Sequence, residues 1–162
     1  MIRLTDILVA TDFGEASDVA IEYGRALART FGSSLHLLHV MENRFLRPSP
    51  VDPHQLTTAT ASRLSQRLTD DDRSALHATA VLETSDSPAE EIVKFAKAHN
   101  IDLIVMGTHG RGAMARVLVG SVAEKVVRTA PCPVLTVRHP EHNFVVPDTD
   151  DTVTHQKPGG PS

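Results

Sequence analysis

The chain has 162 residues, of which 41% are hydrophobic and 22% are charged, and its formal net charge is −4 at pH 7. This size and composition fit one globular domain, and the acidic balance gives no support to a nucleic-acid-binding protein, which usually carries a basic domain. No apolar run approaches the roughly 20 residues of a membrane-spanning helix, and the N-terminus lacks the features of a signal peptide, so we expect a cytoplasmic protein with no membrane partner.

Short apolar runs alternate with segments of helical periodicity along the chain, which is typical of a parallel sheet covered by helices. Two of these runs, residues 7–10 and 103–106, have no polar face, as burial on both sides of a parallel sheet requires. In chain order we predict strands at residues 6–10, 34–40, 77–83, 103–106 and 134–137.

The first predicted helix lies between the first two strands, where an apolar stripe runs along one side and Gly32 ends the helix. The second follows a proline-rich loop over residues 47–53 and places Leu56 and Leu64 on one face, although its threonines and serines weaken it. The acidic run at residues 70–72 is too compact for two separated catalytic carboxylates. We expect it to close the second helix in solvent.

The third predicted helix has the clearest start, because Ser87 offers an N-cap and Glu90 a capping-box partner. The fourth spans residues 121–129. After the last strand the sequence becomes polar and rich in proline and aspartate. We therefore expect one folded domain over residues 1–138 and a flexible tail over residues 139–162.

A glycine-rich stretch lies between the fourth predicted strand and the fourth helix. It consists of Gly107-Thr-His-Gly110-Arg111-Gly112 and, further on, Gly120-Ser121-Val122. Glycines in such a loop let backbone N–H groups point toward an anion, and the helix start adds free N–H groups and a positive dipole end. The Ser121 hydroxyl is a further donor and Arg111 a countercharge. This arrangement predicts a phosphate-binding site.

A second set of residues, Thr11-Asp12, follows the first predicted strand. In open α/β sheets, ligands bind beyond the carboxyl ends of the strands, where neighbouring strands send their connections to opposite faces. If the first and fourth strands are neighbours, Asp12 and Gly107 meet at one crevice. Asp12 is then an acceptor for ribose hydroxyls or for an adenine amino group.

Simpler explanations stay open for each residue taken alone. Gly107 and Gly110 can serve a tight turn. Ser121 and Glu124 fit a capping box that needs no ligand, and Asp12 can cap the first helix.

Signatures of other nucleotide and metal sites are absent from the sequence. It contains neither a P-loop nor a dinucleotide-binding glycine motif after the first strand, and its histidines and one cysteine lack zinc-site spacing. Because fast phosphoryl transfer needs concentrated cations beside the phosphates, the missing P-loop lysine indicates a site that holds a nucleotide rather than one that turns it over.

The spacing Gly107-x-x-Gly110, nine residues, then Gly120-Ser121 matches the Gly-2x-Gly-9x-Gly-Ser/Thr signature of a known family. The segments Ile7-Leu-Val-Ala-Thr-Asp12 and Ala130-Pro-Cys-Pro-Val-Leu-Thr-Val137 fit the same family. Over about residues 1–138 the chain therefore resembles the ATP-binding branch of the universal stress protein family.

The resemblance implies a single α/β domain with a five-stranded parallel sheet of order 3-2-1-4-5, flanked by helices in a Rossmann-like, adenine nucleotide alpha hydrolase-like fold. It also implies ATP binding, with Mg²⁺ accompanying the phosphates, a part in stress response or signalling, and a homodimer formed through the edge strand Val134–Val137. The family's core has no counterpart of the tail.

The resemblance also implies a role for each site residue. Asp12 and the backbone of Val40 would meet the adenosine, and Met106 and Gly107 would line it. ATP-binding members often have proline at the position of Thr11, which leaves this residue a backbone role nearby. The phosphates would be held by Gly110, Arg111, Gly120, Ser121 and Val122.

Catalysis is not predicted, and no side chain is assigned as a metal ligand. One alternative is a slow ATPase or nucleotide-handling enzyme on the same fold. Another is a structural dimerisation or adaptor module with an empty pocket, for which we would expect a damaged glycine signature. Nucleic-acid binding through Gly-x-x-Gly, as in KH domains, is excluded by context, because that loop joins two helices and this one follows a strand.

Overall fold

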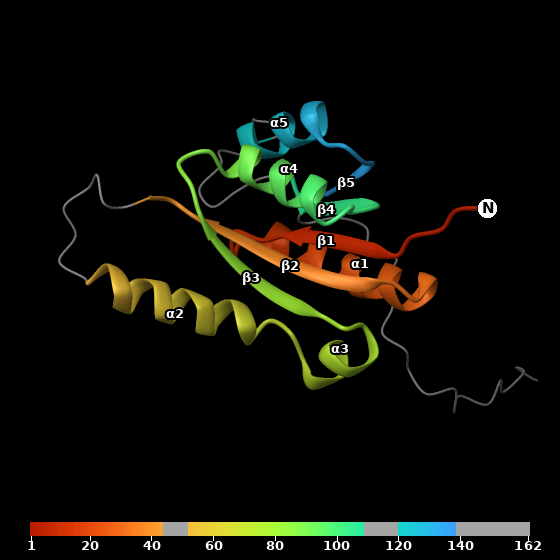
Figure 1. The fold of residues 1–162 in the computed structure, drawn as a ribbon, viewed down its shortest axis with the longest axis horizontal. Helices are drawn as coiled ribbons and strands as arrows, with labels where there is room; N and C mark the ends of the chain where they lie inside the picture. The colour runs from red at the N-terminus through yellow and green to blue at the C-terminus, as the bar shows by residue number, and fades with distance from the viewer. Residues whose placement is uncertain (44–51, 109–119, 139–162) are drawn as a thin grey trace, which may run out of the picture.

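A computed structural model describes residues 1–43, 52–108 and 120–138 (Figure 1). The predicted tail, residues 139–162, lies outside the described residues. Within them, no helix is both long and apolar enough to span a membrane. The elements follow in the order β1 (Asp6–Ala10), α1 (Glu15–Phe31), β2 (Ser34–Met41), α2 (Pro53–Ser65), α3 (Asp70–Ala75), β3 (Thr79–Thr84), α4 (Pro88–Ala98), β4 (Leu103–Gly107), α5 (Ser121–Thr129) and β5 (Val134–Val137).

The five strands form one parallel sheet of order β3-β2-β1-β4-β5, which confirms the predicted fold and strand order. β1 occupies the centre, where Ile7 lies opposite Leu35 of β2 on one side and Leu103 of β4 on the other. β3 begins two residues later than the predicted residue 77, because His77 has a φ of 47° and cannot continue a strand.

Helices cover both faces of the sheet, so the central strand is buried on both sides. Ile7 and Val9 of β1 belong to the core under α1 and α2, whereas Leu8 and Ala10 belong to the core under α4 and α5 (Figure 1). Successive strand residues point to opposite faces, which explains why this run contains no polar position.

Two predicted helix ends have different outcomes. α1 ends at Gly32, whose φ of 68° is the left-handed conformation of a glycine C-cap, as predicted. α4 begins after Ser87 as predicted, but the Ser87 side chain makes no cap hydrogen bond, so the expected capping box is wrong. Glu90 instead accepts a hydrogen bond from Lys125 of α5 at 2.6 Å. This hydrogen bond and the Lys125 charge lower the pKa of Glu90.

The acidic run at residues 70–72 does not close the second helix in solvent, so that prediction is wrong. It forms the first turn of a separate short helix, α3, for which Thr69 is the N-cap in a reciprocal capping box with Asp72. The Asp72 side chain is fully buried and accepts hydrogen bonds from Arg25 Nε at 2.8 and 2.9 Å. α3 is therefore joined to α1 by a buried ion pair.

Opposing effects act on the Asp72 carboxyl group. Burial tends to raise its pKa, but the hydrogen bonds from the Thr69 backbone and from Arg25, together with the Arg25 charge, outweigh burial and lower it. The folded state therefore favours the ionised form of Asp72.

We expect Asp72→Asn to reduce the free energy of unfolding by about 3 kcal/mol at pH 7, because it removes the buried anion of Arg25 and leaves this guanidinium only the exposed Glu22 as an ionic partner. Since the pKa of Asp72 is lowered on folding, this contribution is complete above a pH of about 4 and disappears as the pH falls through the folded-state pKa. Urea denaturation at several pH values measures both effects.

The control is Asp71→Asn, because Asp71 pairs with Arg29 at 2.8 Å and both side chains are about half exposed or more, at 65% and 48%. Such an exposed pair contributes less than about 1 kcal/mol. Equal losses of stability in the two variants would contradict the importance of the buried pair.

Candidate functional site

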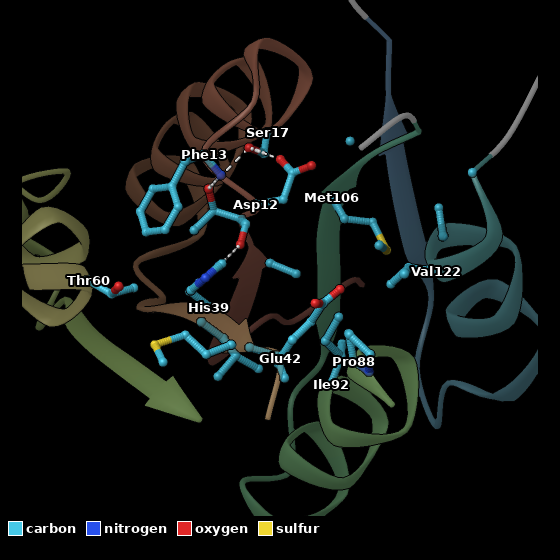
Figure 2. Close-up of a pocket in the computed structure, with 18 of the residues that line it drawn as sticks. Asp12, Phe13, Ser17, His39, Glu42, Thr60, Pro88, Ile92, Met106 and Val122 are labelled. Carbon is cyan, nitrogen blue, oxygen red and sulfur yellow. Dashed lines mark hydrogen bonds between the residues drawn. The ribbon is translucent and has the colours of Figure 1, made fainter. Parts of the chain in front are cut away.

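The pairing of β1 with β4 positions the candidate site. Ala10 lies opposite Met106 at the ends of these strands, and the chain then continues into α1 on one face and toward α5 on the other. This divergence is the switch point at which open parallel sheets bind ligands. A cleft of about 800 Å³ opens there between the strand ends, α2 and the starts of α4 and α5 (Figure 2).

All the predicted site residues that the structure describes line this cleft. They are Thr11, Asp12, Val40, Met106, Gly107, Gly120, Ser121 and Val122. Gly110 and Arg111 lie outside the described residues. The fold thus brings residues from three strand ends and one helix start to the same cleft, while their contacts with a nucleotide stay a prediction.

Asp12 both lines the cleft and holds the start of α1. Its Oδ1 accepts hydrogen bonds from the Gly14 backbone N–H at 2.9 Å and from the Ser17 hydroxyl at 2.8 Å. The N-cap of α1 is Gly14, so Asp12 does not cap the helix in the usual sense. Its carboxylate is instead held in a fixed orientation at the edge of the cleft.

Thr11 is linked to this carboxylate through Ser17. Its hydroxyl donates to Ser17 Oγ at 3.1 Å and accepts from the Phe13 N–H at 3.1 Å, and these bonds form a connected network with Asp12 (Figure 2). The Thr11 carbonyl oxygen lies 2.7 Å from His39 Nδ1, which must carry the proton because a carbonyl only accepts. The Thr11 side chain is therefore used within the protein.

Phe13 adopts a strained conformation beside this network. Its φ of 62° is left-handed, which is rare for a bulky residue and costs on the order of 1–3 kcal/mol. The buried ring lies 4.4 Å from the His39 ring, centroid to centroid, and the Arg63 guanidinium lies 4.2 Å from its centroid. These contacts fix the wall of the cleft that lies toward α2.

Gly107 is needed for packing as well as for access to the cleft. A Cβ added there would lie 2.8 Å from the Ala16 Cβ and 3.0 Å from the Ala16 carbonyl carbon. The end of β4 therefore contacts the first turn of α1 at a separation that only glycine permits. This contact explains the glycine without a ligand, and it also keeps α1 beside the cleft.

The start of α5 presents backbone N–H groups to the cleft that have no acceptor within the helix. Gly120 is the N-cap, with no side-chain cap hydrogen bond, so the capping box that begins at Ser121 is wrong. The first backbone bond of the helix runs from the Glu124 N–H to the Gly120 carbonyl. The N–H groups of Ser121, Val122 and Ala123 thus precede the first helical bond and have no acceptor within the helix. All three residues line the cleft.

The position of α5 is fixed by hydrogen bonds on both sides of the glycine loop. The Thr108 N–H donates to the Val137 carbonyl at 2.8 Å, and the Gly120 N–H donates to the Thr108 carbonyl at 2.5 Å. These bonds join the end of β4 to β5 and to the start of α5. The helix N-terminus is therefore held at this edge of the sheet, and the positive dipole end of such a helix favours anions.

Comparison with known proteins identifies the family. The sequence profile described as "Universal stress protein family" matches residues 4–138. The chain belongs to the universal stress protein family.

Individual relatives support this membership. The chain is 33% identical over 150 residues to a universal stress protein of Methanocaldococcus jannaschii, with 83% of this chain and 82% of that protein covered. It is 34% identical over 140 residues to one from Thermus aquaticus, with 82% and 97% covered. The solved structure of universal stress protein UspA from Lactobacillus plantarum matches with a TM-score of 0.69 at 28% identity, covering 85% of this chain and all of that one.

The sequence did not reveal every residue that lines the cleft of this universal stress protein. Phe13, His39, Glu42 and Arg63 also line it. Phe13 directly follows Asp12, so its position next to a predicted binding residue could have indicated that it lines the cleft. No local motif marked Glu42 or Arg63, because the fold brings them to the cleft from the end of β2 and from α2.

We expect Gly107→Ala to destabilise this universal stress protein by about 1–3 kcal/mol, the usual cost of overpacking a close contact. The new methyl group would overlap Ala16, as the 2.8 Å separation shows. Chemical denaturation measures the loss. Combining Gly107→Ala with Ala16→Gly should cost less than the sum of the two single changes, because the methyl groups no longer overlap. Additive losses would show that the Ala16 methyl group is not the reason for the glycine.

Proposed function

We propose that this universal stress protein binds ATP in the cleft at the switch point and holds it rather than hydrolysing it rapidly, as part of a stress response in the cytoplasm. The observation that carries the proposal is that three backbone N–H groups at the start of α5, which have no acceptor within the helix, line the same cleft as the oriented Asp12 carboxylate. One end of the cleft thus offers donors and the other an acceptor.

The phosphates bind at the donor end. The N–H groups of Ser121, Val122 and Ala123 point out of the first turn of α5, where the helix dipole favours an anion. The Ser121 side chain is exposed and lines the cleft, so its hydroxyl adds a donor. In the proposed site, Gly110 and Arg111 complete the phosphate contacts.

The adenosine binds at the acceptor end. Val40 and Met106 provide apolar contact for the base. Asp12 accepts hydrogen bonds, and its fixed orientation means that little side-chain entropy is lost when a ligand binds. Thr11 contributes through the backbone that holds Asp12 in place, and Gly107 lets the ligand approach the end of β4.

Mg²⁺ enters this proposal with the nucleotide. Within residues 1–43, 52–108 and 120–138, no group of three or more His, Cys, Asp or Glu side chains could hold a metal ion. Mg²⁺ at nucleotide sites is commonly held by phosphate oxygens and water with only one or two carboxylates. The described side chains therefore fit a Mg²⁺ ion that is held mainly by the phosphates of ATP better than one that is coordinated by protein side chains alone.

Structures with the same fold have been solved with adenine nucleotides. A universal stress protein in complex with cAMP matches at 20% identity and a TM-score of 0.63. One from Archaeoglobus fulgidus in complex with dAMP matches at 21% identity and a TM-score of 0.60. At these identities the likeness concerns the fold, so the case for ATP in this chain rests on its own residues.

Slow turnover follows from the cations near the cleft. Among the described residues that line it, Arg63 is the single lysine or arginine, and its guanidinium lies over the Phe13 ring. Fast phosphoryl transfer needs several cations and a positioned base around the γ-phosphate. The described part of the site is better equipped to bind phosphates than to transfer them.

A homodimer through β5 is the second part of the proposal. β5 (Val134–Val137) forms one edge of the sheet and pairs with β4 on one side. An edge strand presents backbone donors and acceptors to a second copy.

Light scattering should give twice the 17.5 kDa mass of the chain, and a monomer at all concentrations would exclude the dimer.

The binding proposal is tested by nucleotide release and by titration. Denaturing the purified protein should release adenine nucleotide that mass spectrometry detects, and calorimetry should show ATP binding. We expect Gly120→Val to weaken binding at least about tenfold, because its side chain would crowd the phosphate site, and tenfold corresponds to about 1.4 kcal/mol. The φ of −68° at Gly120 is accessible to valine, so the variant should fold.

Three results would change this conclusion. The absence of ATP binding, or unchanged binding by a folded Gly120→Val variant, would remove the assignment of the pocket. Sustained phosphate release by the wild type that Gly120→Val abolishes would favour a slow ATPase. Thermal unfolding of the variant without nucleotide checks that the protein is folded.

A further inference from the structure

The order of the elements around the cleft determines which part of a nucleotide meets which strand. The start of α5 and the end of β4 lie on one side, the end of β1 follows, and the end of β2 comes next. Neighbouring strands are about 4.8 Å apart, so β2 lies about 10 Å from β4. A nucleotide with its phosphates at α5 therefore extends its ribose past β1 and its base to β2.

The end of β2 offers a slot for a flat apolar group. Val40 packs against the core under α4 and α5, on the same side as Ile92 and Met106. Val122, at the start of α5, adjoins this core too. These side chains all line the cleft, and together they can cover the faces of a purine ring.

Glu42 lies just beyond this slot. It is two residues after Val40, and Figure 2 shows its side chain reaching from the end of β2 into the middle of the cleft. The residue is exposed, and within the described parts of the chain it forms neither a hydrogen bond nor an ion pair. The Asp12 carboxylate, in contrast, already accepts two hydrogen bonds from the start of α1.

We propose that Glu42 recognises the base by accepting a hydrogen bond from the exocyclic amino group of adenine, while Asp12 meets the ribose. This inference rests on the proposed ATP binding and deepens it. An ionised carboxylate only accepts hydrogen bonds, so it pairs with a 6-amino group and repels the oxygen of a 6-oxo purine. The site therefore selects adenine nucleotides over hypoxanthine and guanine nucleotides at Glu42.

The discriminating experiment compares ATP with inosine triphosphate, which has a 6-oxo group in place of the 6-amino group. Calorimetric titration of the wild type should show ATP binding at least about tenfold more tightly, because the wrong base leaves the carboxylate facing an acceptor. Glu42→Gln should reduce this ratio to within about threefold, because an amide can donate to the 6-oxo group as well as accept from the amino group.

The matched control is Glu83→Gln. Glu83 lies opposite Val40 on the neighbouring strand β3 but is not one of the residues that line the cleft, so the change removes an equal charge close by. This variant should keep the wild-type ratio. A fall in the ratio in both variants would show that net charge, rather than contact with the base, sets the preference, and would overturn the assignment.

The remaining outcomes separate this inference from the proposal beneath it. If the wild type binds both nucleotides equally, or if Glu42→Gln keeps the wild-type ratio, ATP binding stands and the role of Glu42 is overturned. If the wild type binds neither nucleotide, both proposals fall. A reduced preference for ATP over inosine triphosphate in Glu42→Gln alone supports Glu42 as the residue that recognises the base.

Discussion

The parallel pairing of β1 with β4 is the constraint on which the site depends. Its register sets Ala10 beside Met106, so Asp12 and Gly107 emerge at the same edge of the sheet. A shift by one residue would exchange the β1 side chains that face the two cores and would move Ala10 away from Met106. The glycine at residue 107 then allows the first turn of α1 to pack against β4, and hydrogen bonds through Thr108 hold the start of α5 beside both.

This geometry separates donors from acceptors along the cleft. Backbone N–H groups gather at the start of α5, whereas carboxylates lie at the ends of β1 and β2. Under the proposed function, a triphosphate would be attracted to the first end and repelled from the second, so these charges would set the direction in which a nucleotide lies. The strained Phe13 and its contacts with His39 and Arg63 form the wall beside that path.

The sequence was enough to predict the strand order and the switch point, because they follow from local composition and from the family pattern. The same pattern predicted that the described residues of the glycine signature lie at the switch point. The burial of Asp72 was not predictable, since a run of aspartates is ordinarily solvated, and the cation that pairs with it in the interior, Arg25, lies 47 positions away in the sequence. The sequence allowed Ser121 to be either an N-cap or a phosphate donor. In the structure the N-cap is Gly120, whose N–H donates to the Thr108 carbonyl. Glu42 follows a strand without any motif, so its place in the cleft became evident only from the fold.

In the proposed function, the cleft orders a nucleotide from phosphate at α5 to base at β2. A crystal structure of the protein with bound ATP would show this order. We expect phosphate oxygens within hydrogen-bonding distance of the N–H groups of Ser121, Val122 and Ala123, with the ribose at Asp12 and the adenine beside Val40. A nucleotide bound elsewhere, or bound in this cleft with its base at α5, would contradict it.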